Sequence, residues 1–166
     1  MNEWYTVFCK PRGERTAEAN LGNQGYAVYL PRLLTQRRRA GKWVKRIEPL
    51  FPRYLFLKPR DARQSLAPVR STLGVASLVR FGGQPAVVSD AVVEALRARQ
   101  DPAGGVHLHH TVLKPGAAVK FTDGPLHGLE GIFSKETGEE RVFVLLDLLG
   151  KINSVRVNRD WLVPVT

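Results

Sequence analysis

The side chains most capable of chemistry in this chain are cations, and they gather in two places. Between Gln36 and Arg46, six of eleven residues are Lys or Arg, and Gly41 and Trp43 stand among them. Cations neutralise phosphates and an indole ring stacks on bases, so a hairpin tip with this composition could bind nucleic acid; a solvated basic turn is the alternative. A second basic cluster is expected from Lys10, Arg12 and Arg15, with Arg70, Thr72 and Arg80 nearby.

Motifs for catalysis are missing from the sequence. It contains no phosphate-binding loop, dinucleotide fingerprint or nucleophile elbow, and its carboxylates are scattered. His107, His109 and His110 could ligate a metal, but Cys9 is the only thiol and the histidines fall in a stretch that resembles a linker. We therefore expect a binding protein that is not an enzyme and uses no metal or other cofactor.

Charge is divided unevenly along the 166 residues. Residues 1–100 carry 18 Lys and Arg against 7 Asp and Glu, whereas residues 101–166 carry 7 against 8. The stretch 101–114 is rich in Gly and His and lacks an apolar period. We predict a basic domain over 1–100, a linker over 101–114 and a second domain over 115–166. The charge of the first domain indicates a polyanionic partner.

The single cysteine and the first residues of the sequence indicate the cellular compartment. Cys9 lies in an apolar run, which predicts a buried thiol in a reducing compartment. The first residues lack the regions of a signal peptide, and no apolar run approaches the ~20 residues of a membrane span. We expect a cytoplasmic monomer without membrane contact.

The first hundred residues alternate between strand-like and helix-like segments. Strands are predicted over 4–9, 27–30, 50–57 and 75–81, with a hairpin over 36–46. Helices are predicted over 14–23, over 61–67, and after Ser89 or Asp90, where Val92, Val93 and Leu96 share one face. The predicted fold class is α+β: an α/β sandwich in which helices cover a mostly antiparallel sheet, followed by a small second domain.

The predicted strand over 50–57 is apolar on both faces. Alternation places Phe51, Leu55 and Leu57 on one face. It places Leu50, Pro52, Tyr54 and Phe56 on the other. One face can enter the core, and the second needs either another layer of this chain or a partner protein.

The sequence of the second domain does not decide between helices and strands. Glycines punctuate short apolar segments between Pro115 and Gly138, as in small β-barrels. Between Val142 and Leu149, however, apolar residues occupy all four positions expected for a helical stripe. They also occupy all four positions expected for one face of a strand. Helix and strand therefore both remain open here.

Ordered motifs resemble the NusG family of transcription elongation factors. They are Trp4-Tyr5 with Cys9-Lys10, Glu48-Pro49-Leu50-Phe51-Pro52 before Tyr54-Leu55-Phe56, and Gly74-Val75 before Val79-Arg80-Phe81-Gly82. Pro115-Gly116, Val119, Gly124, Gly128 and Gly131 resemble the KOW motif that follows in that family. The resemblance covers essentially the whole chain and is closest to the family's specialised antiterminator branch, RfaH.

The resemblance implies a factor that binds RNA polymerase and suppresses pausing and termination. An apolar patch would contact the clamp helices of the largest subunit, and the matching residues are Phe8, Phe51, Pro52, Tyr54, Phe56 and Phe81. A basic face would read the exposed non-template DNA strand. The residues expected there are Lys10, Asn20, Thr72 and Gly74, with Arg12, Arg15 and Arg70 as nearby phosphate contacts.

The sequence departs from the RfaH pattern at several of these sites. Pro11, Asn20 and Leu73 replace its cationic or histidine residues, so the recognised DNA element is expected to differ. Ser65-Leu66-Ala67 replaces the triplet that contacts the gate loop of the second-largest subunit, which puts bridging of the polymerase cleft in question.

The resemblance implies that both a helical form and a barrel form of the second domain can occur. RfaH-type domains pack as a helical hairpin over the polymerase patch and refold, when released, to a five-stranded barrel that contacts a small-subunit ribosomal protein. Glu48 and Arg141 would form the closing ion pair, here termed the interdomain latch. Gly128 and Gly131 would cost about 1 kcal/mol each in a helix. A general NusG-like factor with a permanent barrel, and a ribosome-associated RNA-binding KOW protein, are the alternatives.

Overall fold

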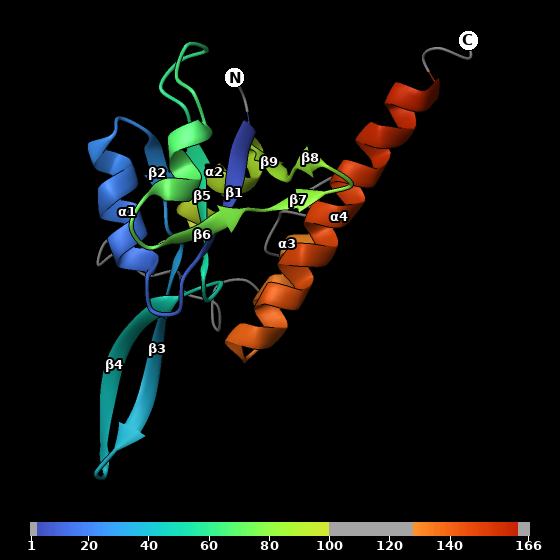
Figure 1. The fold of residues 1–166 in the computed structure, drawn as a ribbon. Helices are drawn as coiled ribbons and strands as arrows, with labels where there is room; N and C mark the ends of the chain where they lie inside the picture. Colours follow the sequence, from blue (N-terminus) through green and yellow to red (C-terminus); the bar gives the residue numbers. More distant parts are fainter. Residues whose placement is uncertain (1–2, 100–127, 163–166) are drawn as a thin grey trace.

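A central five-stranded sheet separates two layers of helices in the computed structural model, which describes residues 3–99 and 128–162 (Figure 1). The predicted linker, its three histidines and the motif residues from Pro115 to Gly124 lie outside these ranges. The sheet contains β1 (Glu3–Cys9), β2 (Ala27–Tyr29), β5 (Tyr54–Lys58), β6 (Val75–Leu78) and β9 (Val87–Ser89). Its order is β2-β5-β1-β6, with β9 also paired to β1, and every pair is antiparallel.

Two hairpins and five helices complete the described structure. The hairpins are β3 (Arg32–Arg39) with β4 (Lys42–Pro49) and β7 (Arg80–Phe81) with β8 (Gln84–Pro85). The helices are α1 (Glu14–Asn23), the 3-10 helix η1 (Ala67–Ser71), α2 (Asp90–Ala98), α3 (Gly128–Phe133) and α4 (Gly138–Leu162). The predicted α+β class with antiparallel pairing is confirmed, as is the hairpin turn at Gly41, where φ is +79°.

The alternation of β1 assigns its residues to two apolar clusters. Val7 and Cys9 point to the side covered by α1, where Ala17 and Leu21 are fully buried. Trp4 points to the opposite side and joins the cluster formed by α2, α3 and α4. The predicted stripe on α2 is confirmed, because Val92, Val93 and Leu96 are all buried in this second cluster.

Residues 50–57 do not form one strand, contrary to the prediction. β4 ends at Pro49, and the chain turns before β5 begins at Tyr54, whose N–H donates to the Phe51 carbonyl at 2.9 Å. Arg53 has φ +73°, a left-handed conformation that a strand cannot contain, and Pro52 has no N–H to pair. The turn places Phe51 in the same cluster as Leu50 and Phe56, so the predicted alternation is wrong for Phe51, which was expected on the face of Leu55 and Leu57.

The other corrections concern short segments. The predicted helix over 61–67 is absent; instead the Asp61 carboxylate accepts hydrogen bonds from the N–H groups of Arg63 and Gln64, forming a local turn. The predicted strand over 75–81 is interrupted at Val79. The Gly82-Gly83 pair, with φ +57° and +80°, reverses the chain and makes β7 and β8 a separate hairpin.

Candidate functional site

The six residues predicted to contact polymerase lie together and are here termed the apolar face. Phe8 on β1 is directly opposite Tyr54 on β5, and their ring centroids are 5.1 Å apart. Phe51, at the turn before β5, meets Phe56 edge to face at 6.2 Å. The remaining members of the apolar face are Pro52 in that turn and Phe81 on β7.

α3 and α4 cover most of this apolar face. Phe51 and Phe56 are completely buried, and they share one cluster with the apolar side chains of both helices. The contributing helix residues are Leu129, Ile132, Phe133, Leu145 and Leu149. Gly138 permits a close approach, since a Cβ at this position would lie 2.6 Å from Pro52 Cγ, and Gly150 faces the Phe81 ring at an ordinary packing distance.

Arg141 joins α4 to the end of β4. Its side chain is 1 % exposed, Nε donates to the Leu50 carbonyl at 2.7 Å, and a terminal nitrogen donates to the Glu136 carbonyl at 2.8 Å. Burial lowers the pKa of the Arg141 guanidinium, and the nearby negative charge of Glu48 acts in the opposite direction. Glu48, the other residue of the predicted interdomain latch, therefore lies near enough to act electrostatically on Arg141.

The start of α4 carries a side-chain N-cap, Thr137, that sequence reasoning missed. The Thr137 hydroxyl accepts from the Glu140 N–H at 3.1 Å and donates to the Glu140 carboxylate at 2.8 Å. The spacing Thr-x-x-Glu is the signal that could have predicted it, but the glycines between Pro115 and Gly138 favour the short strands of a small barrel.

α3 was also hard to recognise because of its glycines. Leu129, Ile132 and Phe133 have the i, i+3, i+4 spacing of a helical face, and all three are buried. A Cβ on Gly131 would lie 3.3 Å from Val144 Cγ1, so the glycine lets α3 approach α4 closely. The guanidinium of Arg99, just after the end of α2, lies 4.2 Å from the Phe133 ring centroid.

Arg53 connects the apolar face to the basic region. Its guanidinium lies 4.2 Å from the Phe8 ring centroid, and its Nε donates to the Cys9 carbonyl at 2.9 Å. Its backbone N–H donates to the Glu14 carboxylate at 3.1 Å. Cys9 is completely buried as predicted, and burial, followed by the charge of Glu14, raises the pKa of its thiol to about 12, so the thiol stays protonated.

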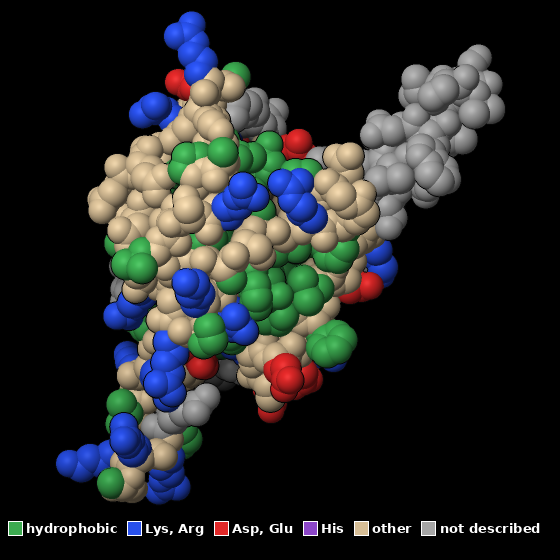
Figure 2. All heavy atoms as spheres, viewed as in Figure 1, with side chains coloured by type: hydrophobic (Ala, Val, Ile, Leu, Met, Phe, Trp, Pro, Cys, Tyr) green, Lys and Arg blue, Asp and Glu red, His purple; other side chains and the backbone are tan. Residues whose placement is uncertain are grey.

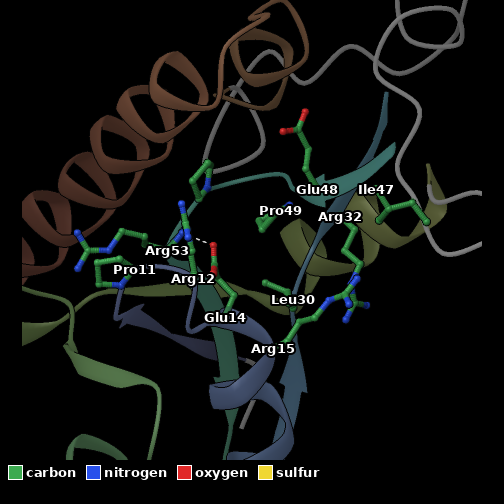
Figure 3. A pocket seen from close by; sticks show the side chains of 11 residues that line it. Pro11, Arg12, Glu14, Arg15, Leu30, Arg32, Ile47, Glu48, Pro49 and Arg53 are labelled. Atoms are coloured by element: carbon green, nitrogen blue, oxygen red, sulfur yellow. Dashed lines mark hydrogen bonds between the residues drawn. The ribbon is translucent and has the colours of Figure 1, made fainter. Parts of the chain in front are cut away.

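A hollow of about 470 Å³ lies between the start of α1 and the base of the β3–β4 hairpin. In Figure 3, Glu14 and Arg53 lie on one side, joined by a hydrogen bond, and Arg32 and Ile47 lie on the other. Four arginines and two glutamates line this hollow: Arg12, Arg15, Arg32, Arg53, Glu14 and Glu48. Cations therefore outnumber carboxylates among its charged residues, and apolar side chains such as Leu30 and Ile47 complete the lining.

Four residues predicted to read DNA meet where α1 approaches η1. The Lys10 N–H donates to the Gly74 carbonyl at 2.9 Å, and Gly74 has φ +90°. The Gln24 side chain donates to the Thr72 hydroxyl at 2.8 Å and to the Asn20 carbonyl at 3.2 Å. Thr72 is buried, and its hydroxyl also donates to the Pro68 carbonyl, so this hydroxyl serves the fold.

The three arginines predicted as nearby phosphate contacts are Arg12, Arg15 and Arg70. The α1–η1 face is here defined as these arginines together with the four residues above: Lys10, Arg12, Arg15, Asn20, Arg70, Thr72 and Gly74. The side chains of Lys10, Arg12, Arg15 and Arg70 are exposed. Leu73, between Thr72 and Gly74, is 67 % exposed. Arg80 was expected near this face but lies elsewhere, because β7 is next to α4 and away from α1 (Figure 1).

Two further kinds of feature are absent from the part of the chain that the structure describes. No group of three or more His, Cys, Asp or Glu side chains within those residues is placed to hold a metal ion. Within the same residues, no helix combines the length and the apolar character needed to cross a membrane.

The family model described as "Transcription termination factor nusG" matches residues 2–97, more than half of the chain. This chain belongs to the NusG family. NusG-family proteins are transcription factors that bind RNA polymerase, so a role in transcription regulation follows from membership.

The matched NusG region contains the whole apolar face, the whole α1–η1 face and Glu48. Arg141, α3 and α4 lie beyond it. The NusG domain thus carries both candidate interfaces, and the residues that cover the apolar face come from the part of the chain after the match.

Proposed function

We propose that this chain is an antitermination factor of the RfaH type, which binds RNA polymerase at the clamp helices of the largest subunit. Bound there, it suppresses pausing and termination, and it has no covalent chemistry of its own. The non-template DNA strand recruits it through the α1–η1 face. A general NusG-like factor differs from this proposal because its polymerase-binding face is permanently open.

One observation supports the proposal most directly: α3 and α4 cover the apolar face. The aromatic rings of Phe51 and Phe56 are inaccessible while these helices are in place. Aromatic side chains in desolvated pockets supply most of the energy of protein interfaces. The same rings can therefore serve either the internal contact or a polymerase contact, and the two occupants exclude each other.

The internal contact has features of a reversible cover. α3 has six residues and includes Gly128 and Gly131, so its helical state depends on packing against α4 and the NusG domain. The contact at Arg141 uses a buried charge, and burying a charge offsets much of what its hydrogen bonds contribute. On release, residues 115–166 would become available to a second partner, for which we propose a small-subunit ribosomal protein.

The α1–η1 face supports recruitment by DNA. Its four exposed cations can contact phosphates, which position a strand without reading its sequence. Because the Thr72 hydroxyl is already engaged by Gln24 and Pro68, sequence reading would rest on other groups of the face. Leu73 is the exposed apolar candidate there, consistent with a DNA element unlike that of RfaH.

Transcription in vitro with purified RNA polymerase, on templates that carry pause sites and a terminator, tests this proposal. The wild-type chain should shorten pauses and increase read-through. Tyr54→Ala and Phe81→Ala remove partly buried rings of the apolar face and should abolish both effects.

Phe143→Ala is the matched control, because this ring is 76 % exposed on α4 and lies outside the apolar cluster. It should behave as wild type. If pausing and termination are unchanged by the wild-type chain on every template, the proposed activity is wrong.

A further inference from the structure

The β3–β4 hairpin extends away from the central sheet and carries a cationic outer end. β3 and β4 pair with each other as a two-stranded sheet, and the hairpin reaches well beyond the other elements (Figure 1). Figure 2 shows Lys and Arg side chains gathered over this projection. The sequence from Leu34 to Ile47 contains six cations and no acidic residue. The tip is therefore a concentrated positive charge at a distance from the α1–η1 face.

Trp43 is the feature that a solvated basic tip does not explain. Its side chain is 67 % exposed, so the hairpin gains little from burying it. Trp43 pairs with Arg38 across the hairpin, and the Arg38 guanidinium lies 5.9 Å from the ring centroid. Lys45 stands two residues along β4, on the same face as Trp43. One large ring is thus flanked by two cations on one surface.

We propose that this hairpin tip binds an unpaired nucleic-acid strand, with a base stacked on Trp43 and flanking phosphates at Arg38 and Lys45. Stacking on an aromatic side chain requires an accessible base face, which a single strand offers and a duplex conceals between neighbouring pairs. The guanidinium above the ring adds a cation–π contact on one side and leaves most of the indole surface for the base. Cα positions of Trp43 and Lys45 are about 7 Å apart along a strand, which allows the ammonium to reach a phosphate next to the stacked base.

The opposite face of the same hairpin supplies a matched control. Val44 is also exposed, at 45 %, and it follows Trp43 in β4, so its side chain lies on the other surface of the hairpin. Neither residue contributes to the two apolar clusters, and substitutions at both should leave the fold intact.

Fluorescence titration of the full-length protein with an oligothymidylate of about 10 nucleotides tests the proposal. Stacking should quench the emission of Trp43, and the difference between wild type and Trp43→Phe separates this signal from that of Trp4 and Trp161. Trp43→Leu should weaken binding roughly 5- to 150-fold, the range for loss of one stacked base. Trp43→Phe should retain part of the affinity, and Val44→Ala all of it.

The charges are tested by salt dependence. Replacing Arg38 and Lys45 by Gln should reduce the slope of log affinity against log salt by about 0.7 for each lost phosphate contact. Lys10→Gln with Arg70→Gln, on the α1–η1 face, should leave the quenching of Trp43 unchanged, so failure of the DNA face and failure of the tip are distinguishable. An oligouridylate of equal length tells whether DNA or RNA is the preferred strand.

Equal affinity of wild type and Trp43→Leu, or unchanged Trp43 emission at saturation, would overturn the proposal. Equal Trp43-dependent binding of a duplex of the same length would also overturn it, because the paired bases could not stack on the ring.

Discussion

At the scale of single residues, backbone geometry fixes the α1–η1 face more strongly than side-chain chemistry does. Gly74 has φ +90°, and a Cβ at this position would lie 2.6 Å from the backbone nitrogen of Ala17 and 2.8 Å from the Gly13 carbonyl. The close approach allows the Lys10 N–H to reach the Gly74 carbonyl. The position of Lys10 on this face therefore depends on a residue that has no side chain.

Gly74→Ala is expected to lower the free energy of unfolding by roughly 2–4 kcal/mol, since it adds both a steric clash and a strained φ. Gly22→Ala is the control, because Gly22 lies in α1 and a Cβ added there would have no neighbouring atom within 4 Å. It should be neutral or stabilising by up to about 1 kcal/mol. Urea denaturation of both variants measures the difference, and equal midpoints would contradict this account of Gly74.

Arg53 shows the limit of sequence reasoning at the same scale. Its left-handed φ is held by Glu14 and by the Cys9 carbonyl, both distant in sequence. Local patterns favour a continuous strand through this position, because the neighbouring residues are apolar and aromatic. Pro52 was the local signal against a continuous strand, but nothing local showed that Glu14 and the Cys9 carbonyl would stabilise a left-handed Arg53. The types of residue on the apolar face were recognisable from the motif itself.

At the scale of elements, Asp90 ties the start of α2 to two strands. Its carboxylate accepts from the Trp4 indole N–H at 2.7 Å and from the Lys58 ammonium at 3.0 Å. The hydrogen bond from Lys58 is the largest cause of a lowered pKa for Asp90 in the folded state, and the bond from Trp4 acts in the same direction. The ionised carboxylate thus connects β1, β5 and α2.

Because the folded state favours the ionised form, the contribution of Asp90 is present above its unfolded pKa and is lost as the pH falls through its lower folded pKa. Asp90→Asn should destabilise the protein by about 1 kcal/mol at pH 7, a modest value because the side chain is partly exposed. The variant should also show a shallower loss of stability in acid. Thermal unfolding from pH 7 down to pH 3 measures both, and parallel curves for the two proteins would exclude this role.

The elements themselves differed in how well they could be predicted. α2 was predictable because Val92, Val93 and Leu96 repeat at helical spacing, and a serine stands at the N-cap position, although its side chain makes no capping hydrogen bond. α3 conflicted with its own composition, since Gly128 and Gly131 favour turns and the helix is stabilised by packing against Val144 and Arg99. Short elements that depend on distant partners are the ones that periodicity misses.

At the scale of the whole molecule, the surface of the NusG domain that we propose for polymerase is covered by helices from the rest of the chain. The described structure has α3 and α4 on the apolar face, with Arg141 buried at the edge of the contact. Arg141→Glu would place a carboxylate beside Glu48 and remove both backbone hydrogen bonds, which should disfavour the covered state by roughly 3–5 kcal/mol.

Hydrogen exchange of the amides in α3 reports on this release. Arg141→Glu should abolish protection in residues 129–133 and leave β1 and β5 protected, because the sheet does not depend on α4 for its pairing. Lys151→Glu is the matched charge reversal, since Lys151 is exposed on the same helix and pairs with Asp147 at 3.0 Å. It should exchange as wild type does. Retained protection of α3 in Arg141→Glu would show that Arg141 does not hold the cover.

The affinity of purified RNA polymerase for four forms of the chain tests the central claim most directly: wild type, Arg141→Glu, Lys151→Glu, and Arg141→Glu combined with Tyr54→Ala. If the open state is populated at about 0.1–10 % in the wild type, release by Arg141→Glu should tighten the apparent affinity roughly 10- to 1,000-fold. Lys151→Glu should bind as wild type does, and the added Tyr54→Ala should abolish the gain. Unchanged affinity on release, or a gain that survives Tyr54→Ala, would contradict the assignment of the covered apolar face to polymerase.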